Sequence, residues 1–456
     1  MDIVLIGNGK VGGNLTSQLV REGHNVTVID KNPDKLKRIQ DSQDVMCIEG
    51  NGATAEVQKE AGVNRADLLI ATTPNDETNM LCCLIAKKLG AKKTISRVRN
   101  PEYYGQIELI REDISLSMVI NPERMTADEI FRVLAFSAAS RVEVFAKGRV
   151  ELVEYKLLEN SPLIGKMLMD IYGSFKTKCL ICAVQRNKGD KTEIFIPSGN
   201  FVLEAGDRIS IASSHKALEK FFRSTGTFKN KIKNVMIVGG GKIAFYLASQ
   251  LSEIGMSVKI IESDMQRCRE LAENLDKASI ICGDGTDQEL LLEEGLRDSD
   301  AFVSLTGIDE VNIITALYAK KNSEAKVVAK INRESYVDLT AQLGLDSIIS
   351  PKFITATGIL SYVRSLQNAK ESDIEALYHL VGNNVEAIEF KVRDGADDLI
   401  GIPLKDLRLK KDMLICAIIR KRNIIIPSGA DCIETGDSVV VVSKDHHLRS
   451  LSDMFD

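Results

Sequence analysis

The sequence lacks the long apolar segment that a membrane-spanning helix requires. About 20 consecutive apolar residues are needed for such a helix, and the apolar runs of this chain are much shorter. It also lacks an excess of positive charge, since 59 Lys and Arg residues stand against 64 Asp and Glu residues, for a formal net charge of -5. Binding to nucleic-acid phosphates depends on basic side chains, so we expect no nucleic-acid partner. Met1 stands almost directly before an apolar segment at 3–6, which leaves no room for a signal peptide.

Cysteine and histidine are both sparse. The nine cysteines do not show the spacing of a disulfide framework, and several lie within apolar runs, which predicts reduced, buried thiols in a cytosolic protein. One Cys-x-x-Cys motif, Cys179 and Cys182, lies in a segment typical of a strand. Its thiols should therefore differ in direction or depth, and we predict no metal site. The five histidines all lie away from the glycine-rich segments described below.

The chain is a tandem repeat. The segment 3–12 returns as 235–244, at an offset of 232 residues, and Val28-Ile29-Asp30 returns as Ile260-Ile261-Glu262 at the same offset. Further along, the Ile-Pro-Ser-Gly segment at 196–199 returns at 426–429. Because these landmarks keep one order with little drift, they indicate a duplicated unit of about 230 residues.

Each repeat changes in character partway. Its first part alternates short β-branched runs with amphipathic helices, which is typical of a parallel sheet, and its last part is rich in strands and turns. The predicted fold is α/β: a tandem duplication of a Rossmann-like parallel-sheet domain followed by a small β-rich α+β domain. The predicted parts are a Rossmann-like nucleotide-binding domain at 1–120, a crossover helix at 121–141, a small β-rich domain at 142–223, a linker at 224–232, a second Rossmann-like domain at 233–350, a second crossover helix at 351–376 and a second small domain at 377–456.

Capping residues mark the expected helix starts. A helix should open at Lys10 and stop at Gly23, and Asn32-Pro33 should supply an N-cap and a first-turn proline for the next helix. A capping box at 126–129 predicts the start of the first crossover helix, and the second is expected near 353–366. The predicted strands of the small domains are 150–157, 179–185, 193–196 and 208–212, then 385–392, 414–420, 424–426 and 438–442.

A GxGxxG motif opens the first repeat between a predicted strand and a predicted helix. In that position the motif is typical of dinucleotide-binding sites. Gly7 allows a tight turn, Gly9 lets a pyrophosphate approach the backbone, and Gly12 lets the helix pack closely. The helix N-terminus offers free N–H groups and partial positive charge to phosphates. Asp30, at the end of the next strand, is placed to accept both ribose hydroxyls, and its charge disfavours the 2′-phosphate of NADP.

The second repeat keeps this pattern with Gly239, Gly241, Ala244 and Glu262. An empty, degenerate pocket is the alternative, and it applies more to the second half. Neither turn is a phosphate-binding loop of the hydrolytic type, because no Ser or Thr for Mg²⁺ follows the turn lysine of either half, Lys10 or Lys242. These lysines either reach a phosphate or remain solvated on the surface.

Further polar residues recur at the expected strand ends, where ligands bind in open α/β sheets. Each is either a turn residue or part of the pocket, and recurrence at one offset favours the pocket. Asn79 and Asn312 also recur, but we assign them to helix structure. The predicted nucleotide-contacting residues are Gly7, Asn8, Gly9, Lys10, Val11, Gly12, Asp30, Asn51, Thr72, Thr73 and Arg97 in the first half, and Gly239, Gly240, Gly241, Lys242, Ile243, Glu262, Asp284, Thr306 and Lys330 in the second.

Several motifs resemble those of the RCK family (regulator of potassium conductance, also called KTN). They are the segments 50–54, 66–72, 75–79 and 97–103, and the Ile-Pro-Ser-Gly and Gly-Asp pairs of the small domains. The resemblance covers nearly the whole chain, twice. The second half departs from the pattern with Ala244, Glu262 and Lys330 in place of Gly12, Asp30 and Arg97.

The resemblance implies a non-enzymatic regulatory subunit that binds NAD(H), or alternatively ATP or ADP, in its Rossmann-like domains. It further implies a homo-oligomer, a tetramer whose eight RCK units form a ring, on the cytoplasmic face of the inner membrane beneath a TrkH- or TrkG-like membrane potassium transporter. An NAD-dependent dehydrogenase is the main alternative, although no histidine is placed for hydride-transfer chemistry. A redox-sensing repressor would need a basic helix-turn-helix, for which the acidic chain has no spare domain.

Overall fold

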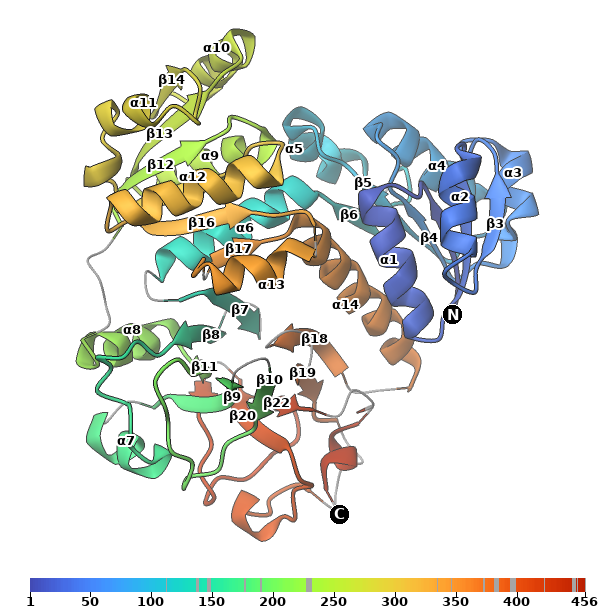
Figure 1. The fold of residues 1–456 in the computed structure, drawn as a ribbon. Helices are drawn as coiled ribbons and strands as arrows, with labels where there is room; N and C mark the ends of the chain where they lie inside the picture. Colours follow the sequence, from blue (N-terminus) through green and yellow to red (C-terminus); the bar gives the residue numbers. More distant parts are fainter. Residues whose placement is uncertain are drawn as a thin grey trace.

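The computed structural model describes residues 1–456 except 112, 137–138, 146–148, 176–177, 189–190, 227–231, 334, 346, 372–373, 381–384, 394–398, 422, 445–447, 449 and 456. His446, His447 and part of the predicted linker lie outside the described residues. Two α/β units lie above two small β-rich units in the view of Figure 1. The fold class expected from the sequence is therefore confirmed.

The first α/β unit is a parallel sheet with the strand order β3-β2-β1-β4-β5-β6. The order reverses between β1 and β4, which creates the crevice in which doubly wound folds bind their ligands. Its elements are β1 (Asp2–Ile6), α1 (Lys10–Arg21), β2 (Asn25–Asp30), α2 (Pro33–Gln40), β3 (Met46–Glu49), α3 (Ala55–Glu60), η1 (Val63–Arg65), β4 (Leu68–Ala71), α4 (Asp76–Leu89), β5 (Lys93–Arg97), α5 (Pro101–Ile110) and β6 (Met118–Ile120).

The second α/β unit repeats this topology, with the order β14-β13-β12-β15-β16-β17 and parallel pairing throughout. Its elements are β12 (Asn234–Val238), α9 (Lys242–Glu253), β13 (Ser257–Glu262), α10 (Met265–Asn274), β14 (Ala278–Cys282), α11 (Gln288–Glu293), η2 (Leu296–Asp298), β15 (Ala301–Ser304), α12 (Asp309–Asn322), β16 (Lys326–Lys330), α13 (Ser335–Gln342) and β17 (Ser347–Ile349).

Local sequence explains the elements that carry the first turn. Strand β1 is buried from Ile3 to Ile6, as expected for a central parallel strand. Helix α1 buries Leu15 and Leu19 on one face and ends before Gly23, whose φ of +77° lies in the left-handed region. Helix α2 begins as predicted, because the Asn32 side chain accepts hydrogen bonds from two backbone N–H groups of the first turn.

The small units are antiparallel sheets with matching topology, β10-β9-β11-β8-β7 and β18-β19-β22-β20-β21. Their facing surfaces share one apolar core, in which Cys182 and Cys416 are buried, whereas Cys179 belongs to a separate core. The two thiols of the Cys-x-x-Cys motif thus separate as predicted. The elements are β7 (Arg141–Phe145), β8 (Val150–Lys156), α7 (Leu168–Phe175), β9 (Leu180–Lys188), β10 (Lys191–Phe195), β11 (Arg208–Ser213), α8 (His215–Ser224), β18 (Ile374–Leu380), β19 (Val385–Lys391), η3 (Leu404–Asp406), β20 (Met413–Arg420), β21 (Asn423–Ile425), β22 (Ser438–Ser443) and η4 (Leu451–Met454).

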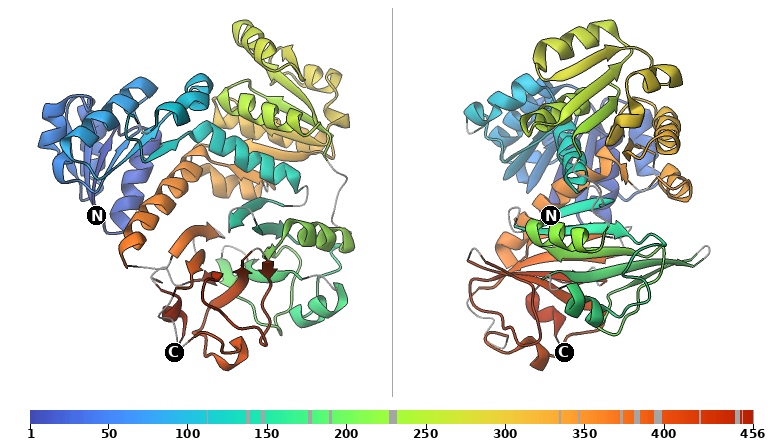
Figure 2. Two further views of the ribbon diagram at one scale, coloured as in Figure 1. Left: turned by 180° about the vertical axis from the view of Figure 1, so that it is seen from behind. Right: turned by 90° about the vertical axis from the view of Figure 1, so that its left-hand side faces the viewer.

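The crossover helices are exchanged between the halves. Helix α6 (Pro122–Ala135) follows the first sheet but packs on α9 of the second unit, and α14 (Pro351–Glu371) packs on α1 of the first. Ile130 and Val133 belong to the core of the second sheet, and Ile359 and Val363 to that of the first. Figures 1 and 2 show α14 alongside α1 and α6 alongside the second sheet. The two α/β units are therefore interlocked, which the sequence did not predict.

The capping box predicted at 126–129 is wrong. Helix α6 begins one turn earlier, at Pro122, and the Asn121 side chain caps it by accepting from the Arg124 N–H. Asn followed by Pro supplies both a cap and a favourable first residue, so Thr126 is left inside the helix, where its hydroxyl donates back to the Pro122 carbonyl at 2.6 Å. Among the residues that the structure describes, no helix is both long enough and apolar enough to cross a membrane.

Candidate nucleotide-binding site

The first glycine turn joins β1 to α1 at the switch point of the sheet. Gly7 has a φ of +96°, and a Cβ on Gly12 would lie 2.0 Å from the Gly7 carbonyl oxygen, so neither position accepts a side chain without a shift of the backbone. A Cβ on Gly9 would meet nothing within 4 Å, so this glycine leaves space for a ligand. The first helical hydrogen bond runs from Gly13 to the Gly9 carbonyl. The backbone N–H groups of Lys10 and Val11 therefore lie in the unpaired first turn, as anion binding requires.

The second turn has the same backbone with different packing. Gly239 has a φ of +97°, and Gly241 again faces open space. Gly240, at the position of Asn8, has no room for a side chain, because a Cβ would lie 2.5 Å from Leu271 Cδ1. Ile243 and Ala244 are buried in the apolar core beneath the turn, whereas Lys242 is half-buried.

A carboxylate fixes each turn. The Asn8 N–H donates to Asp30 Oδ2 at 2.6 Å, and the Gly240 N–H donates to Glu262 Oε2 at 2.7 Å. The other oxygen of each carboxylate accepts from the backbone two residues further on, at 2.9 Å in both halves. A carboxylate can accept about four hydrogen bonds, so both groups keep the capacity to accept ribose hydroxyls. Glutamate thus reproduces in the second turn what aspartate does in the first.

The threonine hydroxyls at the ends of β4 and β15 form hydrogen bonds with other groups of the chain. Thr72 is buried, and its hydroxyl donates to the Gly7 carbonyl at 3.0 Å. The hydroxyl of Thr73 donates to Asn79 Oδ1 at 2.7 Å, and that of Thr306 donates to Asn312 Oδ1 at the same distance. Asn79 and Asn312 also donate to the carbonyls of the strand-end cations Arg97 and Lys330. These two asparagines lie on α4 and α12, but their side chains join the ends of neighbouring strands and do not serve the helices, to which we assign them from the sequence.

The third-strand residues lie apart from the cavity described below. Asn51 and Asp284 are exposed, and each accepts hydrogen bonds within its own turn. For Asp284, the bonds from the backbone and side chain of Thr286 lower the pKa of the carboxyl. A role in ligand contact for these two positions remains a prediction from the sequence.

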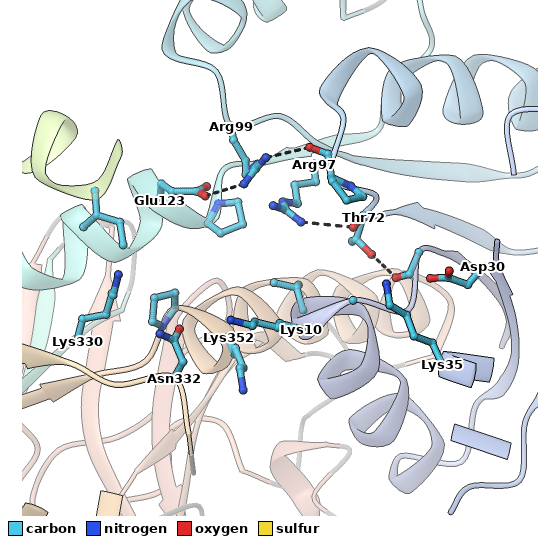
Figure 3. A pocket seen from close by; sticks show the side chains of 17 residues that line it. Lys10, Asp30, Lys35, Thr72, Arg97, Arg99, Glu123, Lys330, Asn332 and Lys352 are labelled. Carbon is cyan, nitrogen blue, oxygen red and sulfur yellow. Dashed lines mark hydrogen bonds and ion pairs between the residues drawn. The ribbon is translucent and has the colours of Figure 1, made fainter. Parts of the chain in front are cut away.

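A cavity of about 400 Å³ opens at the first turn, and both halves of the chain line it (Figure 3). The first half contributes the turn, Asp30, Thr72 and Arg97. From the second half come Ile243 and Lys330, which the repeat assigned to a separate site. The exchange of α6 and α14 explains this, because both helices begin at the cavity and bring the two sheet edges together. The full lining is Gly7, Gly9, Lys10, Val11, Asp30, Lys35, Thr72, Pro74, Arg97, Arg99, Pro122, Glu123, Ile243, Lys330, Asn332, Pro351 and Lys352.

The cavity is strongly positive. Six of its lining side chains are cationic and two are carboxylates; the cations are Lys10, Lys35, Arg97, Arg99, Lys330 and Lys352. Figure 3 shows that these cations come from several elements around the space. Glu123 lies 3.5 Å from Arg99, so it offsets part of this charge.

Two of these cations are held in unfavourable surroundings. Burial lowers the pKa of Arg97, and the neighbouring Arg99 lowers it further, while Arg97 Nε is buried and has no hydrogen-bond partner among the described residues. Burial likewise lowers the pKa of Lys330. Asp309 and Glu123 oppose that shift, and Lys10 adds to it. A bound anion would relieve both the repulsion and the missing hydrogen bond.

Sequence reasoning missed several lining residues. Arg99, Glu123 and Lys352 follow strands or begin helices at the same sheet edge as the turns. A signal existed for two of them: Pro122-Glu123 and Pro351-Lys352 occupy equivalent places in the repeat, directly after the last strand of each sheet. Lys35, on α2, follows the predicted helix start at Asn32 by one turn.

Together, two glycine turns at the switch points of parallel sheets, each held by a carboxylate, define a tandem protein of the nucleotide-binding Rossmann class. The TrkA-N domain model matches residues 3–122 and 235–351, and the TrkA-C domain model matches residues 152–226 and 387–456. The chain therefore belongs to the TrkA family.

Relatives resemble the chain over its full length. A "Trk system potassium uptake protein TrkA homolog" from Archaeoglobus fulgidus is 36% identical over 456 residues, covering 100% of both chains. A "Trk system potassium uptake protein TrkA" from Vibrio alginolyticus is 32% identical over 446 residues, covering 97% of this chain and 95% of the relative.

Solved structures share the fold. The GsuK RCK domain matches with a TM-score of 0.62 at 18% identity, covering 97% of this chain and 92% of the other. The GsuK channel bound to NAD gives a TM-score of 0.62 at 18% identity, covering 97% and 76%. The fold implied by the resemblance to RCK domains is thus confirmed.

Proposed function

We propose that this chain is the regulatory subunit of a potassium-uptake transporter and that it binds adenine nucleotides at its glycine turns. The observation that carries the proposal is the cationic cavity at the first turn, which both halves of the chain complete. The names of the full-length relatives, all Trk system potassium uptake proteins, support the transport role. The membrane partner proposed is a TrkH- or TrkG-like transporter, with this chain on its cytoplasmic face.

NAD(H), ATP and ADP are the proposed ligands. Asp30 has capacity left for a ribose with both hydroxyls free, and its charge disfavours the extra phosphate of NADP. A GsuK channel has been solved with NAD, which supports a dinucleotide. The six cations of the cavity favour a ligand with a run of phosphates, and a triphosphate carries more negative charge than the pyrophosphate of NAD(H).

Binding without chemical conversion fits the cavity best. Its lining includes no histidine, tyrosine or cysteine among the described residues, and its lysines lie among other cations at the turn. No hydroxyl side chain follows Lys10 or Lys242 to hold Mg²⁺. A dehydrogenase would reveal itself by substrate-dependent turnover of NADH, measured as absorbance at 340 nm.

Coupling to the transporter follows from the interlocked halves. A ligand shifts a conformational equilibrium only if it binds the two conformations with different affinity. The cavity supplies this difference, because Lys330 of the second half and Arg97 of the first reach the same ligand only while the two sheet edges stay together. Rotation of one α/β unit against the other then changes the shape of the assembly and the gate of the transporter.

Assembly into a ring of eight units from four chains is supported by exposed apolar side chains at equivalent places. Leu81 on α4 is 47% exposed and Ile314, its counterpart on α12, is 66% exposed. Leu109 on α5 is also exposed, as is Leu343 just after α13. Recurring apolar positions on outer helices are typical of protein–protein interfaces. Light scattering of the Ile314→Asp variant should show a smaller assembly than that of the unmodified chain.

Paired variants of the turn carboxylates test the proposed ligand sites. Calorimetric titration of the full chain with ATP, ADP, NAD⁺ and NADH should show binding, weakened about 10- to 100-fold in Asp30→Ala and more mildly in Asp30→Asn. Asp34→Ala, which changes a nearby exposed carboxylate outside the turn, is the matched control. Glu262→Ala tests the second turn in the same way.

Potassium flux tests the regulatory role. In vesicles that contain the transporter and this chain, added nucleotide should change the flux, and the double variant Asp30→Ala, Glu262→Ala should abolish that change. An unaltered nucleotide response in the double variant would contradict the proposal.

A further inference from the structure

Two cysteines lie together beneath the second turn. Cys282 is the last residue of β14, an edge strand, and its register partner on β13 is Glu262, the carboxylate that fixes the turn. Cys268, on α10, donates its thiol to the Glu262 backbone carbonyl, with a sulfur–oxygen distance of 3.3 Å. Both cysteines therefore lie beside Glu262, and the Cys282 thiol contributes to the raised pKa of Cys268. A dithiol is therefore centred on the residue that holds the Gly240 N–H.

Exposure differs between the two sulfurs. Cys282 is exposed, whereas Cys268 is only 6% exposed. The other close pairs of thiols are buried: Cys82 and Cys83 are neighbours on α4, and Cys182 and Cys416 lie inside the core shared by the small sheets. Among the cysteines, the Cys268–Cys282 pair thus combines a partner within reach with a sulfur open to solvent, which is the arrangement of redox-sensitive thiols.

The first half has no counterpart to this dithiol. At the equivalent places of the repeat stand Leu36 and Glu49, and the nearby Cys47 donates weakly to the Leu36 carbonyl at 3.7 Å. The dithiol is thus an addition to one turn and not a requirement of the fold.

We propose that Cys268 and Cys282 are a reversible thiol–disulfide switch at the second turn, driven by peroxides and reset by low-molecular-weight thiols. The exposed Cys282 sulfur attacks one oxygen of the peroxide, the O–O bond breaks, and Cys282 becomes a sulfenic acid with release of water. The Cys268 sulfur then attacks the Cys282 sulfur, the S–O bond breaks, and the leaving hydroxide takes the thiol proton of Cys268 as a second water. The two thiols are oxidised by two electrons, and one hydrogen peroxide is reduced to two waters.

The order of the two sulfurs follows from their surroundings. Burial raises the pKa of Cys268 to about 11, with further contributions from the Cys282 thiol and from Glu262 and Asp264. Cys268 therefore stays protonated at rest, and Cys282 is the sulfur that meets the oxidant.

Formation of the disulfide alters the turn. The Glu262 carbonyl accepts from both the Cys268 thiol and the Gly283 N–H. Oxidation removes the thiol donor and draws α10 toward the end of β14. The Glu262 carboxylate, anchored on the same residue, then holds the Gly240 N–H less firmly.

Peptide mapping tests the disulfide itself, and it needs no bound nucleotide, so its outcome is independent of the proposed function. The reduced full-length chain is treated with hydrogen peroxide, its remaining thiols are blocked, and it is digested without reductant for mass spectrometry. We expect a linked peptide pair that contains Cys268 and Cys282 and separates in dithiothreitol. Cys282 recovered as sulfinic or sulfonic acid beside a free Cys268, or linked to Cys282 of a second copy, would overturn the proposal.

Two variants sharpen the test. Cys268→Ser keeps a hydroxyl donor for the Glu262 carbonyl but removes the resolving sulfur, so Cys282 should proceed to irreversible acids. Cys47→Ser, which changes the half-buried cysteine of the first half, should leave the yield of the linked pair unchanged. A linked pair lost equally in both variants would contradict the assignment.

Hydrogen exchange measures the consequence for the turn. Oxidation should speed exchange of the Gly240 amide about threefold, because its acceptor is loosened, while the Asn8 amide of the first turn keeps its rate. Equal rates at Gly240 before and after oxidation would overturn the coupling between the dithiol and the turn.

Discussion

The two glycine turns reach the same backbone by different means. In the first, the Thr72 hydroxyl donates to the Gly7 carbonyl, and Gly12 leaves room for that contact. In the second, Leu305 and Ala244 replace these residues and belong to the apolar core. Yet the leading glycines have φ values of +96° and +97°. The left-handed glycine and its carboxylate are the shared requirement, and the support beneath them is free to vary.

The second half also contributes side chains to the cavity at the turn of the first half. Lys330, the strand-end cation of the second sheet, lines the cavity of the first turn together with its counterpart Arg97. Burial lowers the pKa of both, so each is poised to gain from a bound anion. Two copies of one unit thus line a shared cavity.

Gly12 and Ala244 occupy equivalent places beneath the two turns, and exchanging these residue types should change the free energy of unfolding more than the other variants do. Gly12→Ala places a Cβ 2.0 Å from a backbone oxygen, so it should destabilise the first unit by about 2–3 kcal/mol and abolish binding there. Ala244→Gly introduces no clash and should cost about 1 kcal/mol in helix stability. Urea denaturation of both variants measures the difference; equal losses would show that the turns have the same packing after all.

The second largest effect is a loss of stability in acid, which we expect in the first half only. His24 is buried in the first half, where the second half has Met256. Burial, together with the charges of the Met1 amino group and Arg364, lowers its pKa to about 4. Since the unfolded chain protonates this histidine near its ordinary pKa of 6.5, the neutral folded form is fully stable above that pH and loses stability as the pH falls toward 4.

The expected loss is on the order of 2 kcal/mol between pH 6.5 and 4. His24→Met, which copies the second half, should remove this part of the pH dependence. Denaturation midpoints at pH 7 and pH 5 check it, and an unchanged pH dependence in the variant would assign the acid sensitivity to other groups.

The smallest expected effect concerns the shared cavity. Lys330→Ala should weaken nucleotide binding at the first turn about tenfold, or about 1.4 kcal/mol, because one cation of the cavity is lost. Lys242→Ala removes a half-buried lysine that does not line this cavity and serves as the control. Calorimetry in an Asp284→Ala, Glu262→Ala background isolates the first turn. If both lysine variants bind alike, the halves are independent sites.

The sequence predicted the parts that depend on local chemistry. Asn32-Pro33 fixed a helix start, the spacing of Gly7, Gly9 and Gly12 fixed a turn, and the offset between Asp30 and Glu262 revealed the repeat. The helix start and the turn rest on residues close together in the chain, and the repeat rests on matching short segments at one offset.

What the sequence did not predict depends on packing between distant segments. Nothing local distinguishes a crossover helix that covers its own sheet from α6, which covers the other one. For the same reason the repeat places Lys330 in the second site, whereas it lines the cavity of the first turn. Thr72 lines that cavity as expected, but the bond from its hydroxyl to the Gly7 carbonyl was not predicted. The Asn-Pro pair at 121–122 precedes the capping pattern at 126–129 and determines where α6 begins.

The central claim is that the cavity shared by both halves holds the phosphates of an adenine nucleotide at the first turn. A structure of the full chain determined with saturating ATP and, separately, NADH tests it most directly. We predict a ribose beside Asp30 and phosphate oxygens within hydrogen-bond distance of the α1 N-terminus, Arg97 and Lys330. A cavity that contains only solvent under both conditions, or a nucleotide ordered elsewhere on the chain, would contradict the account.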